Sequence, residues 1–258
     1  MKKFDKKYNK KPGKREPEDL TKPPRLNKYV ANAGICSRRR ADVYIKNGAV
    51  QVNDIVVREM GYRVQPGDVV KYKGEVIEPE QNKVYLLMNK PKNVVTTVSD
   101  EKARKTVMEL VKNACTERIY PVGRLDRNTT GLLLLTNDGS LADKLMHPSN
   151  AVRKIYHVTL DKPVTKKHLE AIRDGITLED GDVMVDKISY INEEDKTLIS
   201  IEIHIGRNRI VRRIFEHFKY EVKKLDRVYY GGLTKKHITR GYWRKLTEKE
   251  VIMLKHFS

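Results

Sequence analysis

The sequence is poor in cysteine, in acidic residues and in long apolar runs, and each shortage excludes a class of protein. Only Cys36 and Cys115 occur in 258 residues, too few for a disulfide framework or a cysteine metal site. The seven histidines show no HxH or HExxH pattern of the kind that holds zinc. No stretch approaches the roughly 20 apolar residues of a membrane span, and no apolar segment follows the basic N-terminus as in a secretory signal. We therefore expect a cytoplasmic protein that uses neither metal nor membrane.

Basic residues are in large excess. The chain has 53 Lys and Arg against 34 Asp and Glu, a net charge of +19, while 39% hydrophobic residues leave enough material for a packed core. Fixed cations gain free energy when they release the counterions condensed on phosphates, so a protein this basic is expected to bind a polyanion. The length suggests one sizeable domain, alone or with a small appendage.

Composition and periodicity divide the chain into four parts. Residues 1–24 hold nine Lys or Arg and four of the ten prolines, which predicts a disordered basic arm, either a solubilising tail or a non-specific RNA contact. Residues 25–73 predict a compact unit of two helices and a few short strands. Residues 74–82 lack a clear period and predict a linker. Residues 83–258 mix strands and helices without strict βαβ alternation, which predicts an α+β domain.

In the last part, apolar periodicity predicts individual elements. Strands are expected at residues 85–88, 155–160, 198–205 and 221–225. Helices are expected at residues 106–111, 140–146, 164–174, 210–217 and 248–255.

Three arginines stand at the start of the second predicted helix. Ser37 is a good N-cap, so Arg38 and its two neighbours surround free backbone N–H groups, which favours phosphate binding over a solvated charged face. Together with the runs RLNKYV, GICSRR, VQVND and PGD, this region resembles the S4-like RNA-binding domain. The resemblance implies that the unit reads structured RNA by shape and backbone. The expected contacts are Arg25, Lys28, Arg38, Arg39 and Arg40.

Residues 123–139 read GRLDRNTTGLLLLTNDG. A polar loop flanked by glycines carries one carboxylate, Asp126, and then enters a buried strand of four leucines. A carboxylate placed there could meet a substrate and would need a cationic partner, for which Arg124, Arg127 and more distant arginines are all open. Taken alone, Asp126 could also be a turn residue. If Asp138 shared its cleft, the two could form a glycosidase-like carboxylate pair.

This motif is similar to the catalytic motif of RNA pseudouridine synthases, specifically the ribosomal RNA branch that carries an S4-like domain (RsuA/RluB type). The supporting motifs NKP, KIYHV, GRNRIVRR and LDRVYYG follow in the expected order. The resemblance implies a small S4-like α/β domain followed by a synthase domain with a mixed, mainly antiparallel sheet and a central cleft. It also implies isomerisation of uridine without a cofactor.

The resemblance assigns roles to three residues. Asp126 matches the catalytic aspartate, Tyr156 the tyrosine that lies against the uracil and could remove a proton, and Arg212 the arginine that pairs with the carboxylate through its planar fork. Two positions depart from the family pattern: Ile210 replaces a polar residue, and Asn93 stands where glycine is common. The RNA contacts expected on this domain are Arg124, Lys154, Arg207, Arg209, Arg213 and Arg227.

Two short segments bear on which ribosomal RNA is the substrate. The segments LMHPS and GRNR resemble the large-subunit, RluB-like branch, so a uridine of 23S ribosomal RNA is expected, in free RNA or a ribosomal precursor. A small-subunit (16S) uridine is the alternative. A non-catalytic RNA-binding assembly factor would predict that Asp126 is replaced, and it is present. The protein is expected to act as a monomer.

Overall fold

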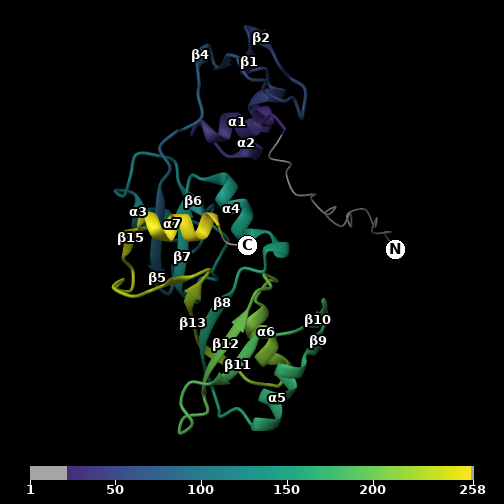
Figure 1. The fold of residues 1–258 in the computed structure, drawn as a ribbon, viewed down its shortest axis with the longest axis vertical. Helices are drawn as coiled ribbons and strands as arrows, with labels where there is room; N and C mark the ends of the chain where they lie inside the picture. The colour runs from purple at the N-terminus through teal and green to yellow at the C-terminus, as the bar shows by residue number, and fades with distance from the viewer. Residues whose placement is uncertain (1–21, 257–258) are drawn as a thin grey trace, which may run out of the picture. The chain divides into compact units, whose positions relative to one another are not determined.

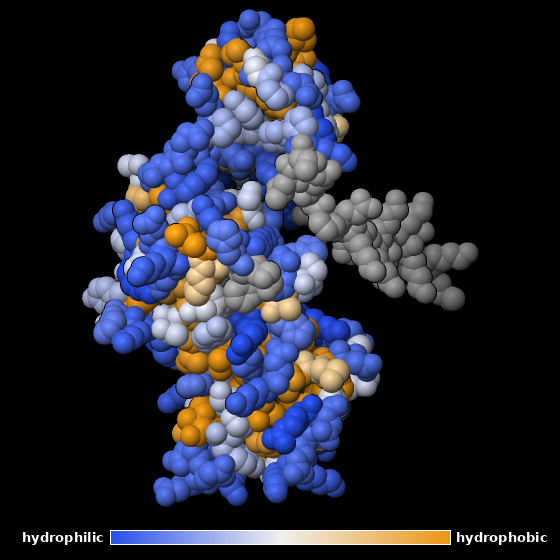
Figure 2. Space-filling view, in the orientation of Figure 1, coloured by the Kyte–Doolittle hydropathy of each residue, from blue (hydrophilic) through white to orange (hydrophobic). Residues whose placement is uncertain are grey.

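The computed structural model describes residues 22–256, which form two compact units divided between Pro79 and Glu80 (Figure 1). The predicted basic arm lies, up to residue 21, outside the described residues. Among the described helices, none is both long and apolar enough to cross a membrane. The face shown in Figure 2 is mostly hydrophilic, with apolar side chains gathered in separate patches.

The first unit packs two helices on a small antiparallel sheet of order β2-β1-β3-β4. As predicted, Ser37 caps the second helix, and its Oγ accepts a hydrogen bond of 3.3 Å from the backbone N–H of Arg40. Asn53 and Asp54 both take positive φ, as a tight hairpin requires. The elements are α1 (Leu26–Asn32), α2 (Arg38–Lys46), β1 (Val50–Val52), β2 (Ile55–Val56), β3 (Val70–Tyr72) and β4 (Glu75–Val76).

The predicted linker over residues 74–82 begins too early. β4 belongs to the sheet of the first unit, and Ile77 is buried in its core with its backbone N–H donating to Val70 O at 2.9 Å. The first unit therefore continues to Pro79. The segment shows no apolar period because an edge strand of two residues, both exposed, is too short to produce one.

The second unit is built on a mixed sheet of order β11-β12-β8-β13-β7-β5-β15, with β14 beside β13 and β6 beside β7. The β13–β7 pair is parallel and the other pairs in this sheet are antiparallel. Its strands are β5 (Tyr85–Lys90), β6 (Tyr120–Pro121), β7 (Thr130–Thr136), β8 (Lys154–Leu160), β11 (Lys187–Tyr190), β12 (Leu198–Ile203), β13 (Val222–Tyr230), β14 (Leu233–Thr234) and β15 (Trp243–Lys245).

Helices cover both faces of this sheet (Figure 1). One core takes apolar residues from α3, α5 and α6, and the other from α4 and α7. A separate hairpin of β9 (Ile176–Leu178) and β10 (Gly181–Val183) lies beside α6. The helices are α3 (Val107–Val111), α4 (Gly139–Met146), the 3₁₀ turn η1 (Pro148–Asn150), α5 (Lys166–Asp174), α6 (Ile210–His217) and α7 (Glu248–Lys255).

The four leucines of β7 separate the two cores. Leu133 and Leu135 belong to the core with α6, Leu132 and Leu134 to the core with α4, and all four are fully buried. Side chains alternate between the two faces of a strand, so a strand that is covered on both faces has apolar side chains at successive positions. The strand therefore fixes the position of the loop that precedes it.

Replacing Gly131 by alanine should destabilise the protein. Gly131 has φ +104°, and a Cβ there would lie 2.6 Å from both Arg227 N and Asp226 Oδ1, where β13 runs beside β7. We expect a loss of about 3 kcal/mol or more in the free energy of unfolding, from overpacking and backbone strain. Urea denaturation measures it. The matched control is Gly206→Ala, whose Cβ would meet nothing within 4 Å; equal losses in the two variants would contradict the close approach.

Candidate active site

Asp126 lies in the loop of residues 122–129, between β6 and β7; we call this the Asp126 loop. Its neighbour Leu125 is buried. The Thr96 hydroxyl donates a hydrogen bond of 2.8 Å to the carbonyl of Leu125 and accepts one of 3.3 Å from its N–H. The N–H of Thr129 closes the loop by donating to Asp126 O at 3.0 Å. The carboxylate itself is half-buried and has no hydrogen bond or ion pair recorded within residues 22–256. The loop is held by its backbone and leaves the carboxylate available.

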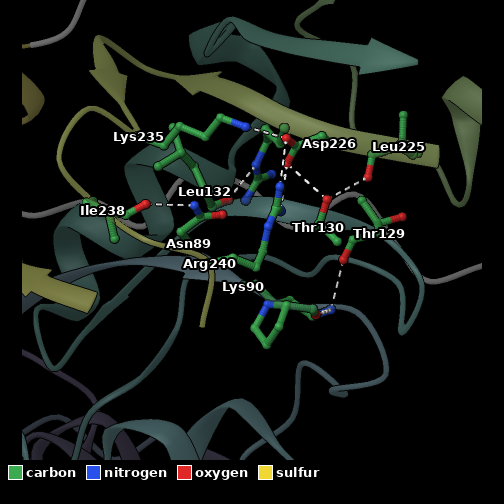
Figure 3. Close-up of polar contacts among 12 residues, drawn as sticks. Asn89, Lys90, Thr129, Thr130, Leu132, Leu225, Asp226, Lys235, Ile238 and Arg240 are labelled. Atoms are coloured by element: carbon green, nitrogen blue, oxygen red, sulfur yellow. Dashed lines mark hydrogen bonds and ion pairs between the residues drawn. The ribbon is translucent and has the colours of Figure 1, made fainter. Parts of the chain in front are cut away.

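A buried lysine holds this loop from below. Lys90, at the end of β5, is fully buried, and its Nζ donates to the carbonyls of Pro91 (3.1 Å), Asp126 (3.1 Å), Arg127 (3.3 Å) and Thr129 (2.9 Å). Figure 3 shows the Nζ directed at the loop backbone. Burial lowers the pKa of Lys90 to about 8, while the Asp126 carboxylate acts in the opposite direction. The motif NKP contains this lysine but does not reveal its role; the available signal was a charge that ends the apolar run YLLM.

Tyr156 on β8 and Arg212 on α6 come from two elements that pack on the core to which Leu125 belongs. Tyr156, on β8, is 9% exposed and belongs to that core together with Val211. Burial and the charge of Arg209 lower the pKa of Arg212, and the Asp126 carboxylate acts in the opposite direction. The Nη1 of Arg212 donates to Val222 O at 2.9 Å, while its Nε is buried without a partner. Within the described residues no ion pair joins Arg212 to Asp126.

The two departures from the family pattern are both accommodated. Ile210 is 5% exposed and fills the core at the first turn of α6. Asn93 takes φ +65°, as expected for a residue that tolerates the left-handed region, and its N–H donates to Arg127 O at 2.9 Å. The turn after β5 therefore also supports the Asp126 loop.

Two of the arginines predicted to contact RNA bind a carboxylate of the chain. The Nη1 and Nη2 of Arg213 donate to the two oxygens of Asp180 at 2.8 and 2.5 Å. Arg207 lies 3.5 Å from the same carboxylate and donates to Gly181 O at 3.0 Å. The hydrogen bonds from Arg213 hold the pKa of Asp180 at about 2. These arginines join the β9–β10 hairpin to α6, whereas Arg209 is exposed, 3.5 Å from Glu216.

The prediction that Arg227 contacts RNA is wrong. Arg227 is 4% exposed, its Nε donates to Leu132 O at 2.8 Å, and its guanidinium lies 4.5 Å from the centre of the Tyr230 ring. Lys154 is also engaged internally, since its Nζ donates to His204 O at 2.7 Å and burial lowers its pKa to about 8. Each cation therefore connects two parts of the sheet. Arg227 joins β13 to β7, and Lys154 joins β8 to the residue that follows β12.

The remaining predicted contacts lie at or near the surface. Arg124 is exposed on the Asp126 loop. In the first unit the guanidinium of Arg40 lies 5.3 Å from the centre of the Tyr44 ring on α2. The exposed members of that unit's predicted set are Arg25, Arg39 and Arg40, and the half-buried ones are Lys28 and Arg38.

An ion-pair cluster beside the Asp126 loop was not predicted. Asp226 on β13 accepts from Arg240 Nη1 at 3.0 Å and from Thr130 Oγ1 at 3.0 Å, and it also pairs with Lys235 (Figure 3). Burial works against ionisation of Asp226, but Arg240 and Lys235 outweigh it and hold its pKa at about 2. Partners 9 and 14 residues away in loops leave no periodic signal in the sequence.

The carboxylate-pair alternative fails on geometry. Asp138 lies beyond the far end of β7, a strand of seven residues that spans about 20 Å. Its side chain caps α4 by accepting from Leu141 N at 3.1 Å and also accepts from the Tyr85 hydroxyl at 2.8 Å. The two carboxylates therefore do not share a cleft. Within residues 22–256 no group of three His, Cys, Asp or Glu could hold a metal ion.

The fold and this loop define a two-domain RNA-modifying enzyme. A family model described as RNA pseudouridylate synthase matches residues 84–217, and an S4 domain model matches residues 24–70. The chain belongs to the RNA pseudouridine synthase family, in the group that carries an S4 domain.

Individual relatives cover nearly the whole chain. It is 42% identical over 234 residues to the ribosomal large subunit pseudouridine synthase B of Bacillus subtilis (strain 168), covering 90% of this chain and 95% of that protein. It is 39% identical to the dual-specificity RNA pseudouridine synthase RluF of Escherichia coli (strain K12), covering 89% and 78%. A crystal structure of a pseudouridylate synthase superposes with a TM-score of 0.66 at 27% identity, covering 89% of this chain and 99% of the other.

Replacing Lys90 by methionine should slow the reaction without weakening RNA binding. Methionine fills the same volume but donates no hydrogen bond, so the carbonyls of the Asp126 loop lose their common donor and Asp126 moves. A displacement of about 1 Å can cost about a hundredfold in rate. Single-turnover rates under saturating enzyme measure it. Lys92→Met, at an exposed position two residues on, is the control; equal rates in the two variants would show that Lys90 does not position the loop.

Proposed function

We propose that this enzyme isomerises a uridine of large-subunit ribosomal RNA to pseudouridine. Asp126 is the catalytic carboxylate, Tyr156 lies against the base, and Arg212 is the cationic partner. The observation that carries the proposal is a carboxylate held at a fixed position by its own backbone, with no side-chain hydrogen bond or ion pair within residues 22–256 and with the half-buried Arg212 in electrostatic range.

The reaction fits a site with one carboxylate. The bond between N1 and C1′ breaks, the uracil turns, a bond forms between C5 and C1′, and the proton leaves C5 while N1 gains one. Electrons and groups are conserved overall, so the chemistry requires no redox partner and no second substrate. Asp126 assists as a nucleophile at the nucleoside or by stabilising developing charge. The target must first leave the base stack, and Tyr156 offers a ring to receive it.

Arg212 supplies the cation that the Asp126 carboxylate needs once RNA covers it. A carboxylate enclosed by RNA loses its water and is protonated unless a cation lies close by. The Arg212 Nε has no partner, and Nη1 is fixed by Val222 O, so the guanidinium is oriented before RNA arrives. In the proposed complex its remaining donors bind Asp126. A bidentate fork orients a carboxylate better than a point charge does.

The RNA class follows from charge and from the relatives. A net charge of +19, an S4-like unit with arginines around the start of α2, and a relative named for the ribosomal large subunit together support large-subunit RNA. We further propose that the enzyme acts in the cytoplasm as a monomer. Mapping pseudouridines in both ribosomal RNAs of cells that lack the gene tests the substrate; a missing pseudouridine in the small subunit would select the alternative.

Replacing Asp126 by asparagine should abolish pseudouridine formation. The amide keeps the size of the side chain but is neither a nucleophile nor an anion, and RNA affinity depends on many cations elsewhere. Pseudouridine is measured by mass spectrometry on a large-subunit RNA transcript, and affinity by fluorescence anisotropy. We expect no product and a Kd within about twofold of the parent enzyme. Product at a rate close to that of the parent would remove Asp126 from catalysis.

Replacing Arg212 by lysine should lower the single-turnover rate about a hundredfold, because the carboxylate loses the planar fork that orients it. Arg213→Lys is unsuitable as the neutral comparison, since Arg213 holds Asp180. The control is Arg173→Lys, an exposed position on α5. If Arg212→Lys reacts as fast as this control, the guanidinium acts only as a surface charge.

A further inference from the structure

The loop between β14 and β15 has a composition that the proposed mechanism does not use. Residues 235–242 read KKHITRGY, with three Lys or Arg, one tyrosine and no Asp or Glu. We call this segment the 235–242 loop. It lies beyond the part of the chain that the synthase family model matches, which ends at residue 217. None of the motifs in the sequence analysis includes it.

The loop is fixed in place by two residues of the central sheet. The buried side chain of Asn89 donates to Ile238 O at 2.8 Å, and its backbone bonds both Gly241 N at 2.8 Å and Tyr242 O at 3.0 Å. From the other side, the carboxylate of Asp226 binds Lys235 and Arg240, as Figure 3 shows. A loop held this firmly loses little entropy when it binds a ligand.

The same two residues place the loop beside the Asp126 loop. β5 lies between β7 and β15, and Gly131 and Trp243 are opposite Lys90 and Met88, so the starts of the two outer strands are about 12 Å apart. Asn89 directly precedes Lys90, which holds the Asp126 loop, and Asp226 also binds Thr130, the first residue of β7. Arg240 is close enough to contribute, after burial, to the lowered pKa of Lys90.

The side chains that the loop turns to solvent suit a nucleic acid strand. Tyr242 is 68% exposed, and no stacking partner is recorded for its ring among residues 22–256. Lys236 and His237 are exposed, and the left-handed φ of +61° at His237 turns the chain at this point. Single-stranded RNA is bound by cations that follow its backbone and by aromatic rings on which its bases stack.

We propose that the 235–242 loop binds the single-stranded RNA next to the target uridine, with an unpaired base stacked on Tyr242 and a phosphate bound by Lys236. The proposal rests on the proposed function for the identity of the substrate strand. A nucleotide placed at Asp126 has its neighbours within reach of the loop, because the strands that follow the two loops begin about 12 Å apart. Duplex RNA keeps its bases stacked and offers no face to Tyr242.

The test measures binding and needs no turnover. The full chain is titrated into a fluorescein-labelled single-stranded oligouridine, and the Kd is followed by anisotropy over a range of salt. Tyr242→Ala should weaken binding about tenfold, the loss of one base stacked on an aromatic ring. Tyr242→Phe, which keeps the ring, should stay within about twofold. Lys236→Ala should reduce the slope of log Kd against log salt by about 0.7, and Lys249→Ala, an exposed control on α7, should leave it unchanged.

Photocrosslinking locates the strand directly. An oligouridine that carries 4-thiouridine is irradiated on the full chain, and peptides are identified by mass spectrometry. Crosslinks within residues 235–242 are expected. The proposal is overturned by crosslinks confined to other segments, by Tyr242→Ala binding as tightly as the parent, or by equal sensitivity of a matched duplex to Tyr242→Ala. Failure of the proposed function would appear separately: the parent enzyme would form no pseudouridine in the large-subunit RNA transcript.

Discussion

The active site depends on one buried ammonium group. Lys90 has no exposed surface, so its charge must be satisfied inside the protein, and the backbone carbonyls of the Asp126 loop supply the acceptors. The requirement is mutual. The carbonyls need a donor once the loop is folded over the end of β5. The lysine needs acceptors once β5 has β7 and β15 on its two sides. The position of the Asp126 carboxylate follows from this exchange rather than from any contact of its own.

The parallel contact between β13 and β7 connects this loop to the rest of the unit. Gly131 allows the backbone of Arg227 to approach β7, and Asp226 at the same level binds Thr130. From Asp226 the ion pairs continue to Arg240 and so to the 235–242 loop. Two loops that meet the substrate in our proposals are therefore held by the same short stretch of β13, and a disturbance of that stretch moves both.

The sequence was sufficient for features that depend on neighbours along the chain. The four-leucine strand, the Ser37 cap and the Asp126 loop were predicted from local pattern, and the family motif supplied the roles of Tyr156 and Arg212. Contacts between distant residues could not be read in this way. The cluster at Asp226 has no periodicity, and the burial of Arg227, which was expected to contact RNA, depends on β7, far away in the sequence. The linker was predicted to begin too early because β4 is an exposed edge strand of two residues, which is too short to show an apolar period.

The pairing of β7 with β13 also orders events in time. Leu132 O accepts its hydrogen bond from Arg227, 95 residues further along the chain. A ribosome synthesises about 5–20 residues per second, so the Asp126 loop waits at least several seconds for the strand that completes it. Contacts of such sequence separation also form slowly once both partners are present. A nascent chain that already contains Asp126 therefore has no assembled site, and the enzyme becomes active only when nearly the whole of it has left the ribosome.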